Sequence, residues 1–411
     1  MPAGTAIRYD AVTGHWSLVS LNLSSTPPSP DSAGLADAAA FWKSAYVHLP
    51  FCAERCPYCD FAVVTEAEGG TSPMMERYVD AVIAEIGMEE RFGPIDAVNL
   101  GGGTPSRLTP AQLERIVTAL DTDHGLASGA EISLEANPED WTIDYGKGLV
   151  DVGFNRISFG VQSFDDDVLK ALGRNHSSNQ AATAVAEAIG HFVTVNLDLI
   201  YGTPGESMAS WAATVEAALD LEPEHLSAYA LTVERGTELS RTISAGAPAP
   251  DPDDQADKYE HLAGRAPQAR LVRYEVSNWC RPGHHSRYNL STWAMGEYIG
   301  FGVGANDHRN GRRWRNVRRL DAYLERIEGG ERPRAGSERL DGAEAERERL
   351  AIGLRLATGV VAGARGERFL ADDEGARHLA AGTIAQRGDR IVVERPLLTD
   401  AVARAMLAVP D

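Results

Sequence analysis

The chain has 411 residues, of which 43% are hydrophobic and 24% are charged, and its formal net charge is −20. This composition is typical of a globular protein and excludes a fibrous, collagen-like or intrinsically disordered chain. The acidic balance argues against nucleic acid as a partner, because an acidic surface repels phosphate groups.

Targeting signals are missing from the sequence. No stretch approaches the roughly 20 consecutive apolar residues that a membrane helix requires. The N-terminus lacks the basic start and apolar core of a signal peptide. We therefore expect a cytoplasmic protein with no transmembrane segment and no nucleic-acid partner. In a reducing compartment, clustered cysteines indicate metal binding or redox chemistry.

Short apolar runs alternate with helical patterns from about residue 44 onward. The alternation predicts parallel strands joined by crossover helices, and so an α/β fold built as a full or partial (β/α) barrel. In such a barrel the chemistry lies at the carboxyl ends of the strands. The predicted strands cover residues 44–51, 95–100, 131–136, 156–161, 192–200 and 225–231, and the helical patterns cover 74–91, 110–120, 165–172, 179–190 and 207–220.

The two ends of the chain follow other patterns. Residues 1–40 are predicted to form a flexible tail, because they include a segment rich in serine and proline. The barrel is expected over residues 41–315. Residues 316–411 are expected to form a smaller, mostly helical α+β accessory domain. Within the barrel, the proline-rich segment 240–258 is predicted to be a surface loop.

Three cysteines fall close together, as Cys52, Cys56 and Cys59 in a C-x3-C-x2-C spacing. Three thiolates on one short loop can bind three irons of a [4Fe–4S] cube, which leaves the fourth iron free to chelate a small molecule. Zinc is the alternative, with His48 as a fourth ligand, although structural zinc sites usually use C-x2–4-C pairs. A third interpretation is that these are reduced thiols without a function.

The cysteine motif, with an aromatic residue before its last cysteine at the end of the first predicted strand, resembles the radical S-adenosylmethionine (SAM) superfamily. Seven segments in chain order resemble the oxygen-independent coproporphyrinogen III oxidase family, and within it the HemW-type haem chaperone branch. These segments cover residues 48–61, 99–106, 133–139, 156–176, 196–207, 226–239 and 274–279. The resemblance implies a partial (β/α)6 radical SAM barrel with a family-type C-terminal domain, a [4Fe–4S] cluster and SAM.

The resemblance also implies which residues bind each cofactor. The three cysteines would hold the cluster, and the glycine-rich turn after the second strand would bind the SAM amino group. Carboxylate, guanidinium and aromatic side chains at other strand ends would bind the rest of SAM, for example the ribose hydroxyls or the methionine carboxylate. Each of these residues alone is equally well explained as a turn, a cap or an ion pair. The expected SAM contacts are Tyr46, Tyr58, Gly102, Gly103, Thr104, Glu135, Gln162, Arg174 and Asp198.

Histidines other than His48 receive simpler interpretations. His176 lies in the segment that follows the fourth strand and is a candidate for lining the site. His191, His225 and His261 are expected on the surface of helices or strands.

The sequence departs from the family pattern at two places. Phe61 replaces an extra cysteine of the decarboxylating branch, which favours the chaperone branch. In the haem motif His-Asn-x-x-Tyr-Trp, Tyr288 replaces the histidine and Thr292 replaces the tyrosine. Tyrosinate can bind haem iron, so Tyr288 is one candidate ligand. The others are His284, His285 and Cys280, although Cys280 is more simply interpreted as a buried structural thiol.

These observations predict a protein that binds a cluster, SAM and haem, and that hands haem to an acceptor protein with the help of an electron donor. The alternative function is oxidative decarboxylation of coproporphyrinogen III, or another radical reaction on a porphyrin. A basic run lies between residues 309 and 319, with arginine at 309, 312, 313, 315, 318 and 319. It is interpreted as a solvated or ion-paired face, with a binding edge for porphyrin propionates as the sharper hypothesis.

Overall fold

The computed structural model describes residues 5–10, 15–20 and 30–409. Part of the predicted tail falls in this range. It contains the antiparallel strands β1 (Thr5–Asp10) and β2 (His15–Ser20) and the helix α1 (Pro30–Ala39). The rest of the predicted tail lies outside the described residues.

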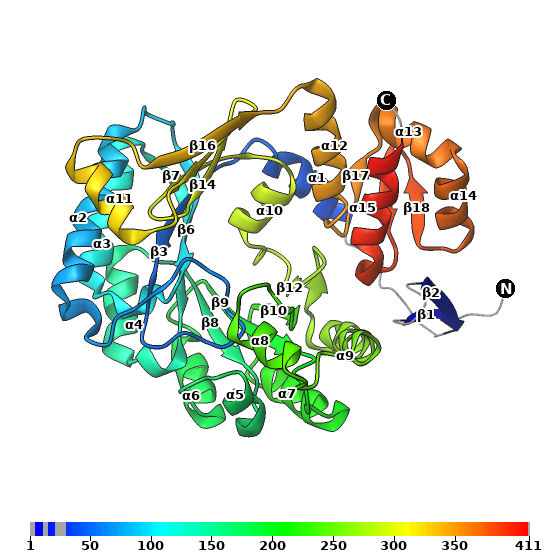
Figure 1. Ribbon diagram of the computed structural model, residues 1–411, viewed down its shortest axis with the longest axis horizontal. Helices are drawn as coiled ribbons and strands as arrows, with labels where there is room; N and C mark the ends of the chain where they lie inside the picture. Colours follow the sequence, from blue (N-terminus) through cyan, green and yellow to red (C-terminus); the bar gives the residue numbers. More distant parts are fainter. Residues whose placement is uncertain (1–4, 11–14, 21–29, 410–411) are drawn as a thin grey trace.

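A large open sheet forms the centre of the molecule (Figure 1). Its parallel part contains, from one side to the other, β10 (His225–Ala230), β9 (Thr194–Tyr201), β8 (Arg156–Gln162), β7 (Leu126–Ala136), β6 (Ile95–Gly102), β3 (Lys43–Leu49) and β13 (Glu297–Phe301). The prediction of six parallel strands joined by helices is confirmed. The strand β13 extends the parallel part beyond the prediction by pairing with β3.

Antiparallel strands continue the sheet at both edges. Beyond β10 lie β12 (Asn278–Cys280) and β11 (Val272–Arg273). Beyond β13 lie β14 (Asn306–Arg309), β15 (Arg312–Asn316) and β16 (Arg334–Arg339). The outermost strands β11 and β16 are not neighbours in this 12-stranded sheet, so the barrel is partial, as expected.

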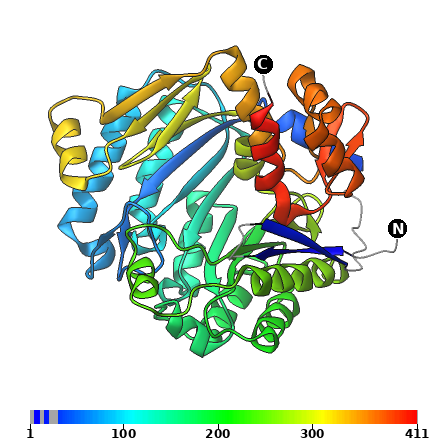
Figure 2. The ribbon, with the colours of Figure 1, turned by 45° about the vertical axis from the view of Figure 1, so that its right-hand side comes forward.

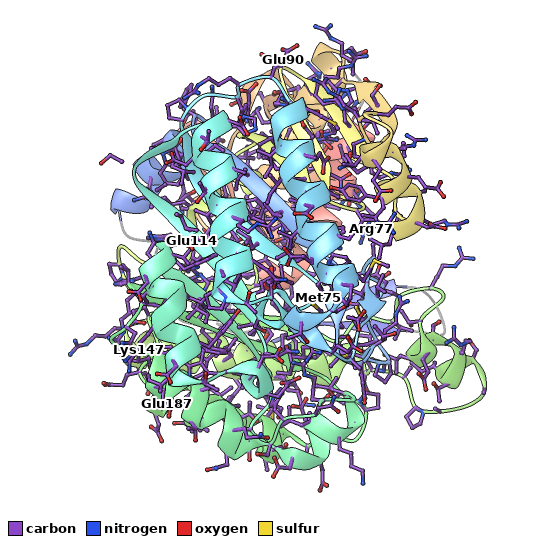
Figure 3. The ribbon with its side chains drawn as sticks, turned by 90° about the vertical axis from the view of Figure 1, so that its left-hand side faces the viewer. Met75, Arg77, Glu90, Glu114, Lys147 and Glu187 are labelled. Atoms are coloured by element: carbon purple, nitrogen blue, oxygen red, sulfur yellow. The ribbon has the colours of Figure 1, made fainter. Side chains whose placement is uncertain are left out.

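Amphipathic helices cover the outer face of the parallel strands (Figure 3). On α2 (Pro73–Met88), Met75 is buried against the strands, whereas Arg77 is half exposed. Polar caps determine where the helices begin. At α3 the Thr109 hydroxyl accepts a hydrogen bond from the backbone N–H of Gln112, and the Gln112 side-chain oxygen accepts one from the backbone N–H of Thr109. The other covering helices are α3 (Pro110–Asp123), α4 (Ile143–Val152), α5 (Asp166–Ala171), α6 (Ser178–Ala188) and α7 (Met208–Asp220).

The prediction of a loop over residues 240–258 is wrong. This stretch contains the end of α8 (Glu238–Ser244) and the first half of α9 (Pro252–Arg265). Pro252 occupies the first position of α9, where a missing N–H costs nothing, and the Asp251 carboxylate caps the helix. The buried ammonium of Lys258 then fixes α9 by pairing with Glu206 and Asp254.

The C-terminal unit has a hydrophobic core of its own, formed by residues such as Leu350, Phe369, Ile391 and Met406. Its elements are α12 (Gly342–Gly353), β17 (Val360–Val361), α13 (Gly363–Ala371), α14 (Asp373–Ala380), β18 (Ile384–Arg387), β19 (Arg390–Val393) and α15 (Thr399–Ala408). The helix α11 (Leu320–Glu328) and the strand β16 instead pack with the barrel. We therefore propose a domain boundary near residue 341 in place of 316.

The C-terminal unit packs beside the barrel near α1 (Figure 2). Several contacts join them, of which two are direct polar contacts of Asp37 and Tyr274. The Arg390 guanidinium pairs with Asp37 of α1 at 2.7 Å. The backbone N–H of Ala357 donates to the carbonyl of Tyr274 in the barrel at 2.9 Å.

The buried carboxylate of Glu85 joins three parts of the barrel. It accepts hydrogen bonds from the hydroxyl of Tyr323 on α11 at 2.6 Å, from the backbone N–H of Gly302 after β13 at 2.7 Å, and from the side-chain amide of Asn316 at 2.6 Å. Burial raises the pKa of Glu85 to about 7. The carboxylate therefore connects α2, α11 and the loop after β13.

Replacing Glu85 with alanine should strongly destabilise the barrel. The Glu85→Ala substitution leaves three buried donors without an acceptor, and each such donor costs about 1–3 kcal/mol. We expect the free energy of unfolding, measured by urea denaturation, to fall by at least about 3 kcal/mol. The control Tyr323→Phe removes one donor and should cost about 1 kcal/mol. Equal losses in the two variants would contradict this account.

Candidate functional site

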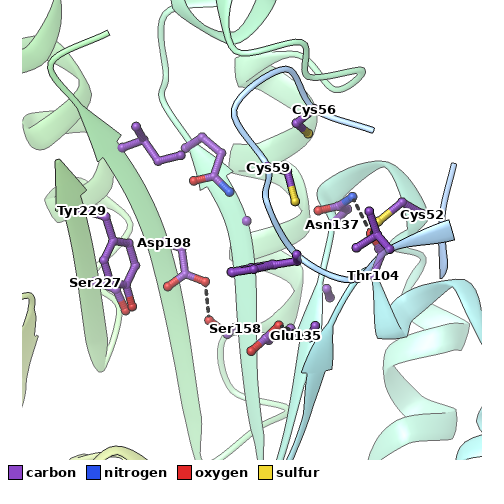
Figure 4. A pocket seen from close by; sticks show the side chains of 18 of the residues that line it. Cys52, Cys56, Cys59, Thr104, Glu135, Asn137, Ser158, Asp198, Ser227 and Tyr229 are labelled. Carbon is purple, nitrogen blue, oxygen red and sulfur yellow. Dashed lines mark hydrogen bonds between the residues drawn. The ribbon is translucent and has the colours of Figure 1, made fainter. Parts of the chain in front are cut away.

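A cavity of about 530 Å³ opens at the carboxyl ends of the parallel strands (Figure 4). Every cofactor-binding residue predicted from the sequence lines it. Strand ends of β6, β7, β8 and β9 and the loops after them supply most of the wall. The predicted residues that line it are Tyr46, Cys52, Cys56, Tyr58, Cys59, Gly102, Gly103, Thr104, Glu135, Gln162, Arg174 and Asp198.

Cys52 is the last residue of β4 (Phe51–Cys52), which pairs with β5 (Val64–Thr65), and Cys56 and Cys59 lie on the loop that follows. All three are free thiols. A turn is closed by the backbone N–H of Cys59 and the carbonyl of Cys56, and the Arg55 guanidinium donates to the carbonyl of Cys59. Burial raises the thiol pKa of Cys52 and of Cys59. Since thiolates are the form that binds iron, a cation at this loop would offset that cost of burial.

The geometry fits a cluster better than zinc. The His48 ring nitrogens are already engaged, Nδ1 with the Tyr46 hydroxyl at 3.1 Å and Nε2 with the Ala62 carbonyl at 2.9 Å. Within the described residues, no three His, Cys, Asp or Glu side chains converge on a single metal-ion position. A zinc ion needs four convergent ligands, whereas a cube spreads three thiolates over three irons.

The glycine turn after β6 needs its glycines for space. Gly102 has a φ of 108°, and a Cβ there would overlap the His48 ring. A Cβ on Gly103 would lie 2.6 Å from the backbone carbon of Pro50. The turn is held against the preceding strand because the backbone N–H of Gly103 donates to the carbonyl of Leu49 at 2.8 Å. Its backbone is therefore brought close to the cysteine loop.

Two carboxylates face the cavity from β7 and β9, the strands on either side of β8. Glu135 on β7 accepts a hydrogen bond from the backbone N–H of Gly102 at 3.1 Å, and burial raises its pKa to about 7. Asp198 on β9 accepts from the hydroxyl of Ser158 at 2.7 Å and from the side-chain amide of Asn196 at 2.9 Å (Figure 4). Burial raises the pKa of Asp198 as well. Both carboxylates suit hydroxyl or cationic groups of a ligand.

The end of β8 and the segment after α5 contribute Gln162 and Arg174 to the cavity wall. The Arg174 guanidinium donates to the side-chain oxygen of Asn137 at 2.5 Å and to the carbonyl of Gly160 at 3.2 Å, while its buried Nε has no partner. A buried unpaired donor in a cavity wall suits a ligand carboxylate. Gln162 has a φ of 65°, an uncommon conformation for a residue other than glycine and one that often marks functional sites.

Two histidine predictions differ from the structure. His176 does not line the cavity. It is buried behind Glu139, with Nδ1 facing the Glu139 carboxylate at 3.1 Å and Nε2 facing the carbonyl of Val161 at 3.0 Å. His225 is not on the surface. Its side chain lines the cavity floor on β10, and its Nδ1 contacts the side-chain oxygen of Asn196 at 2.6 Å.

Sequence reasoning missed a belt of small polar side chains on the inner face of the strands. A signal was present, because single polar residues interrupt otherwise apolar strand runs and a buried polar group requires a partner. The belt lines the cavity between the predicted residues and is formed by Asn99, Ser133, Asn137, Ser158, Asn196 and Ser227.

The arginines between 309 and 319 do not reach the cavity. Arg309 pairs with Asp307 and Glu89, and Arg313 pairs with Glu348. The ion-paired interpretation is therefore supported at these two positions.

The helix α10 (Arg287–Trp293) carries the segment that departs from the haem motif. The Tyr288 ring lines the cavity and stacks on the Tyr46 ring, with centroids 6.0 Å apart and an interplanar angle of 27°. Cys280 is buried beside α10 in a separate apolar cluster, and burial raises its thiol pKa to about 12. Its surroundings are those of a structural thiol, as the simpler interpretation expected.

The comparisons with known proteins agree with this fold and site. The model of the radical SAM superfamily matches residues 46–218. Coproporphyrinogen III oxidase (HemN) from Escherichia coli has a similar structure, with a TM-score of 0.75 over 91% of this chain and 92% of that chain, at 21% identity. The fold and the cysteine-lined cavity define this chain as a radical SAM protein.

Sequence relatives give the family within that class. The haem chaperone HemW of Mycobacterium tuberculosis is 42% identical over 377 residues, which cover 88% of this chain and 94% of that protein. HemW of Escherichia coli is 35% identical over 64% of this chain and 69% of its own length. The chain therefore belongs to the HemW haem chaperone family.

Adding a methyl group to the glycine turn should damage the site. The Gly102→Ala substitution places a Cβ against the His48 ring in a left-handed conformation. The control Gly153→Ala has the same φ of 108°, but its Cβ meets only a Ile132 methyl at 4.0 Å. We expect a clearly larger fall in the thermal unfolding midpoint for Gly102→Ala, since only that variant adds a steric clash to a backbone cost of about 1–2 kcal/mol. Identical midpoints would contradict the packing described for this turn.

Proposed function

We propose that this protein is a haem chaperone that binds a [4Fe–4S] cluster and SAM, and that transfers haem to an acceptor protein. The observation that carries the proposal is the cavity itself, in which three free thiols share one wall with the polar residues expected to bind SAM. Membership of the HemW family supplies the haem-transfer part, because the relatives are named haem chaperones.

Cys52, Cys56 and Cys59 would hold the cluster, which when bound supplies an electron to the sulfonium of SAM. The turn at Gly102, Gly103 and Thr104 would accommodate the amino group of SAM. These assignments are supported by the closeness of the turn to the cysteine loop.

The remaining residues would bind the rest of SAM. The carboxylate of Glu135 would accept hydrogen bonds from the ribose hydroxyls, and the unpaired donor of Arg174 would bind the methionine carboxylate. Tyr46, Tyr58, Gln162 and Asp198 complete the proposed set of contacts.

Haem is proposed as the cargo, received at the helix α10. Tyr288 stands where the family pattern has a histidine, and its phenol lies inside the cavity wall. Burial raises the pKa of this phenol above its ordinary value, so iron binding would have to displace the proton. His285 is the neighbouring alternative, because burial lowers its pKa to about 4 and keeps its imidazole neutral, the form that binds metal.

An acceptor protein and an electron donor are further proposed partners, since a chaperone needs a recipient and a cluster needs reduction. We propose a cytoplasmic location, because free cluster thiols persist in a reducing compartment. None of the described helices is long and apolar enough to cross a lipid bilayer. The alternative function, decarboxylation of coproporphyrinogen III, gains no support from the cavity. Phe61 lines the mouth where the decarboxylating branch has a further cysteine.

Removing any one cluster cysteine should abolish cluster binding. In anaerobically reconstituted protein we expect about four irons and four sulfides per chain, since a cube contains four of each. The variants Cys52→Ala, Cys56→Ala and Cys59→Ala should each lose most of this iron and the visible absorption, while Cys280→Ala should keep both. Iron loss in Cys280→Ala alone, or zinc in place of iron in the wild type, would contradict the assignment.

The affinity for SAM should depend on the ionisation of Glu135. Its pKa is raised to about 7, so the carboxylate loses its proton as the pH rises from 6 to 8 and becomes a better acceptor for two hydroxyls. Anaerobic calorimetry should show tighter SAM binding at pH 8 than at pH 6. Glu135→Gln should bind roughly tenfold more weakly, with less dependence on pH, given about 1.5–3 kcal/mol for a hydrogen bond to a charged group. The exposed control Glu114→Gln should behave as wild type.

Haem binding tests the chaperone function directly. In an anaerobic titration of the reconstituted protein, followed in the Soret and charge-transfer bands, we expect stoichiometric binding by the wild type. Loss of a tyrosinate-like spectrum in Tyr288→Phe would identify Tyr288 as the ligand, and an unchanged spectrum would move the assignment to His285, tested by His285→Ala. The absence of binding above a non-specific background in the wild type would refute the chaperone function.

A further inference from the structure

Two cysteine sulfurs at the cavity receive hydrogen bonds from side chains outside the cysteine loop. The Thr104 hydroxyl, after β6, lies 3.5 Å from the sulfur of Cys52. The Arg174 guanidinium, after α5, lies 3.5 Å from the sulfur of Cys56. Both distances are within the range for hydrogen bonds to sulfur, whose radius is larger than that of oxygen. Two of the three proposed cluster ligands therefore carry a side-chain donor.

Asn137 joins these two donors. Its side-chain oxygen accepts from Arg174 at 2.5 Å, and its side-chain nitrogen lies 3.4 Å from the hydroxyl oxygen of Thr104 (Figure 4). The residue follows β7, between the strands whose loops carry Thr104 and Arg174 in the sheet order. A continuous chain of hydrogen bonds thus runs from the Cys52 sulfur to the Cys56 sulfur through Thr104, Asn137 and Arg174.

The neighbours of Asn137 determine the orientation of its side-chain amide. The guanidinium of Arg174 can only donate, so the Asn137 oxygen must face it. The Asn137 nitrogen also donates to the carboxylate of Glu139 at 3.1 Å, and an acceptor-only carboxylate requires the NH₂ end there. The buried ring of His176 holds Glu139 in place from behind. Glu139 and Arg174 therefore set the amide in one orientation.

This orientation determines the direction of the Thr104 hydroxyl. Because the Asn137 NH₂ group donates to the Thr104 oxygen, the Thr104 proton is left to point at the Cys52 sulfur. Were the amide reversed, the hydroxyl would donate to the amide oxygen and leave the sulfur. The direction of the bond on Cys52 is thus determined by Asn137, a residue that does not itself touch a sulfur.

We propose that Asn137 is a positioning residue that holds Thr104 and Arg174 as hydrogen-bond donors to two cluster thiolates and thereby raises the reduction potential of the cluster. Reduction adds negative charge to the cluster and its sulfurs, and donors to sulfur stabilise that charge. The proposal rests on the cluster assigned under the proposed function. It adds that Thr104 and Arg174, two of the proposed SAM contacts, also determine how readily the cluster accepts an electron.

The experiment measures the midpoint potential of the reconstituted, SAM-free protein by redox titration followed by electron paramagnetic resonance. In Thr104→Val, which removes the donor at nearly constant volume, the equilibrium constant for reduction should fall about tenfold, which is about 59 mV for a one-electron couple. Thr104→Ser keeps a hydroxyl and should restore the wild-type potential. Thr183→Val, the same substitution at an exposed position of α6 outside the cavity, should leave the potential unchanged.

A second measurement tests Asn137 by a vibrational readout, because the charge that an aspartate adds would itself shift the potential. In Asn137→Asp the side chain can only accept, so the Thr104 hydroxyl should turn toward it and leave the Cys52 sulfur. Resonance Raman spectra of the iron–sulfur stretches should shift between H₂O and D₂O in the wild type and in Thr104→Ser. This deuterium shift should be reduced in Asn137→Asp and in Thr104→Val.

The outcomes separate this inference from the proposed function. A wild type that does not assemble a cluster would refute the proposed function. A loaded wild type whose potential and deuterium shift match those of Thr104→Val would refute this inference alone. If Thr104→Val does not assemble a cluster, Asn137→Asp decides: an unaltered deuterium shift refutes the inference and a reduced shift supports it.

Discussion

The parallel register of the sheet is the constraint on which the site depends. Across neighbouring strands, Tyr46 pairs with Asn99, and Asn99 with Ser133. Two residues after Ser133 on β7, Glu135 pairs with Ser158, which itself pairs with Asn196. Because side chains alternate between the two faces of a strand, a slip of one residue in any pair would turn part of this polar belt to the outside. Register therefore decides whether the cavity exists.

Hydrogen bonds from α2 hold the end of β3, which leads into the cysteine loop, next to the segment after β13. The hydroxyl of Tyr78 on α2 donates to the carbonyl of His48 at the end of β3 and accepts from the backbone N–H of Val303 after β13. Glu85, about two turns further along α2, accepts a hydrogen bond from the backbone N–H of the adjacent Gly302. The strand β13, which the sequence pattern did not predict, thus supports the loop that would bind the cluster.

The C-terminal unit contacts the helix α10, which contributes Tyr288 to the same cavity. The Arg355 guanidinium lies over the Trp293 ring at 4.6 Å, and Trp293 ends the helix that carries Tyr288. Arg355 also lies 3.8 Å from the buried carboxylate of Glu275. The C-terminal unit therefore contacts α10, the helix proposed to receive haem. Tyr288 on this helix and the three cysteines line the same cavity.

The sequence by itself determined the alternation of strands and helices, the cysteine loop and the residues at the strand ends, because period, spacing and turn residues are local properties of the chain. The expected SAM contacts from Tyr46 to Asp198 were implied by the family resemblance, and they line one cavity because the carboxyl ends of the parallel strands meet at one edge of the sheet. Only the tertiary structure decided the roles of residues such as Asn137, His176 and His225. Their partners lie on other strands, for example 37 residues away between His176 and Glu139, and hydrogen bonds over such separations depend on how the strands pack. For the same reason we propose the edge of the C-terminal unit near 341 and not at 316, since pairing of β16 with β15 is a long-range contact that periodicity does not show.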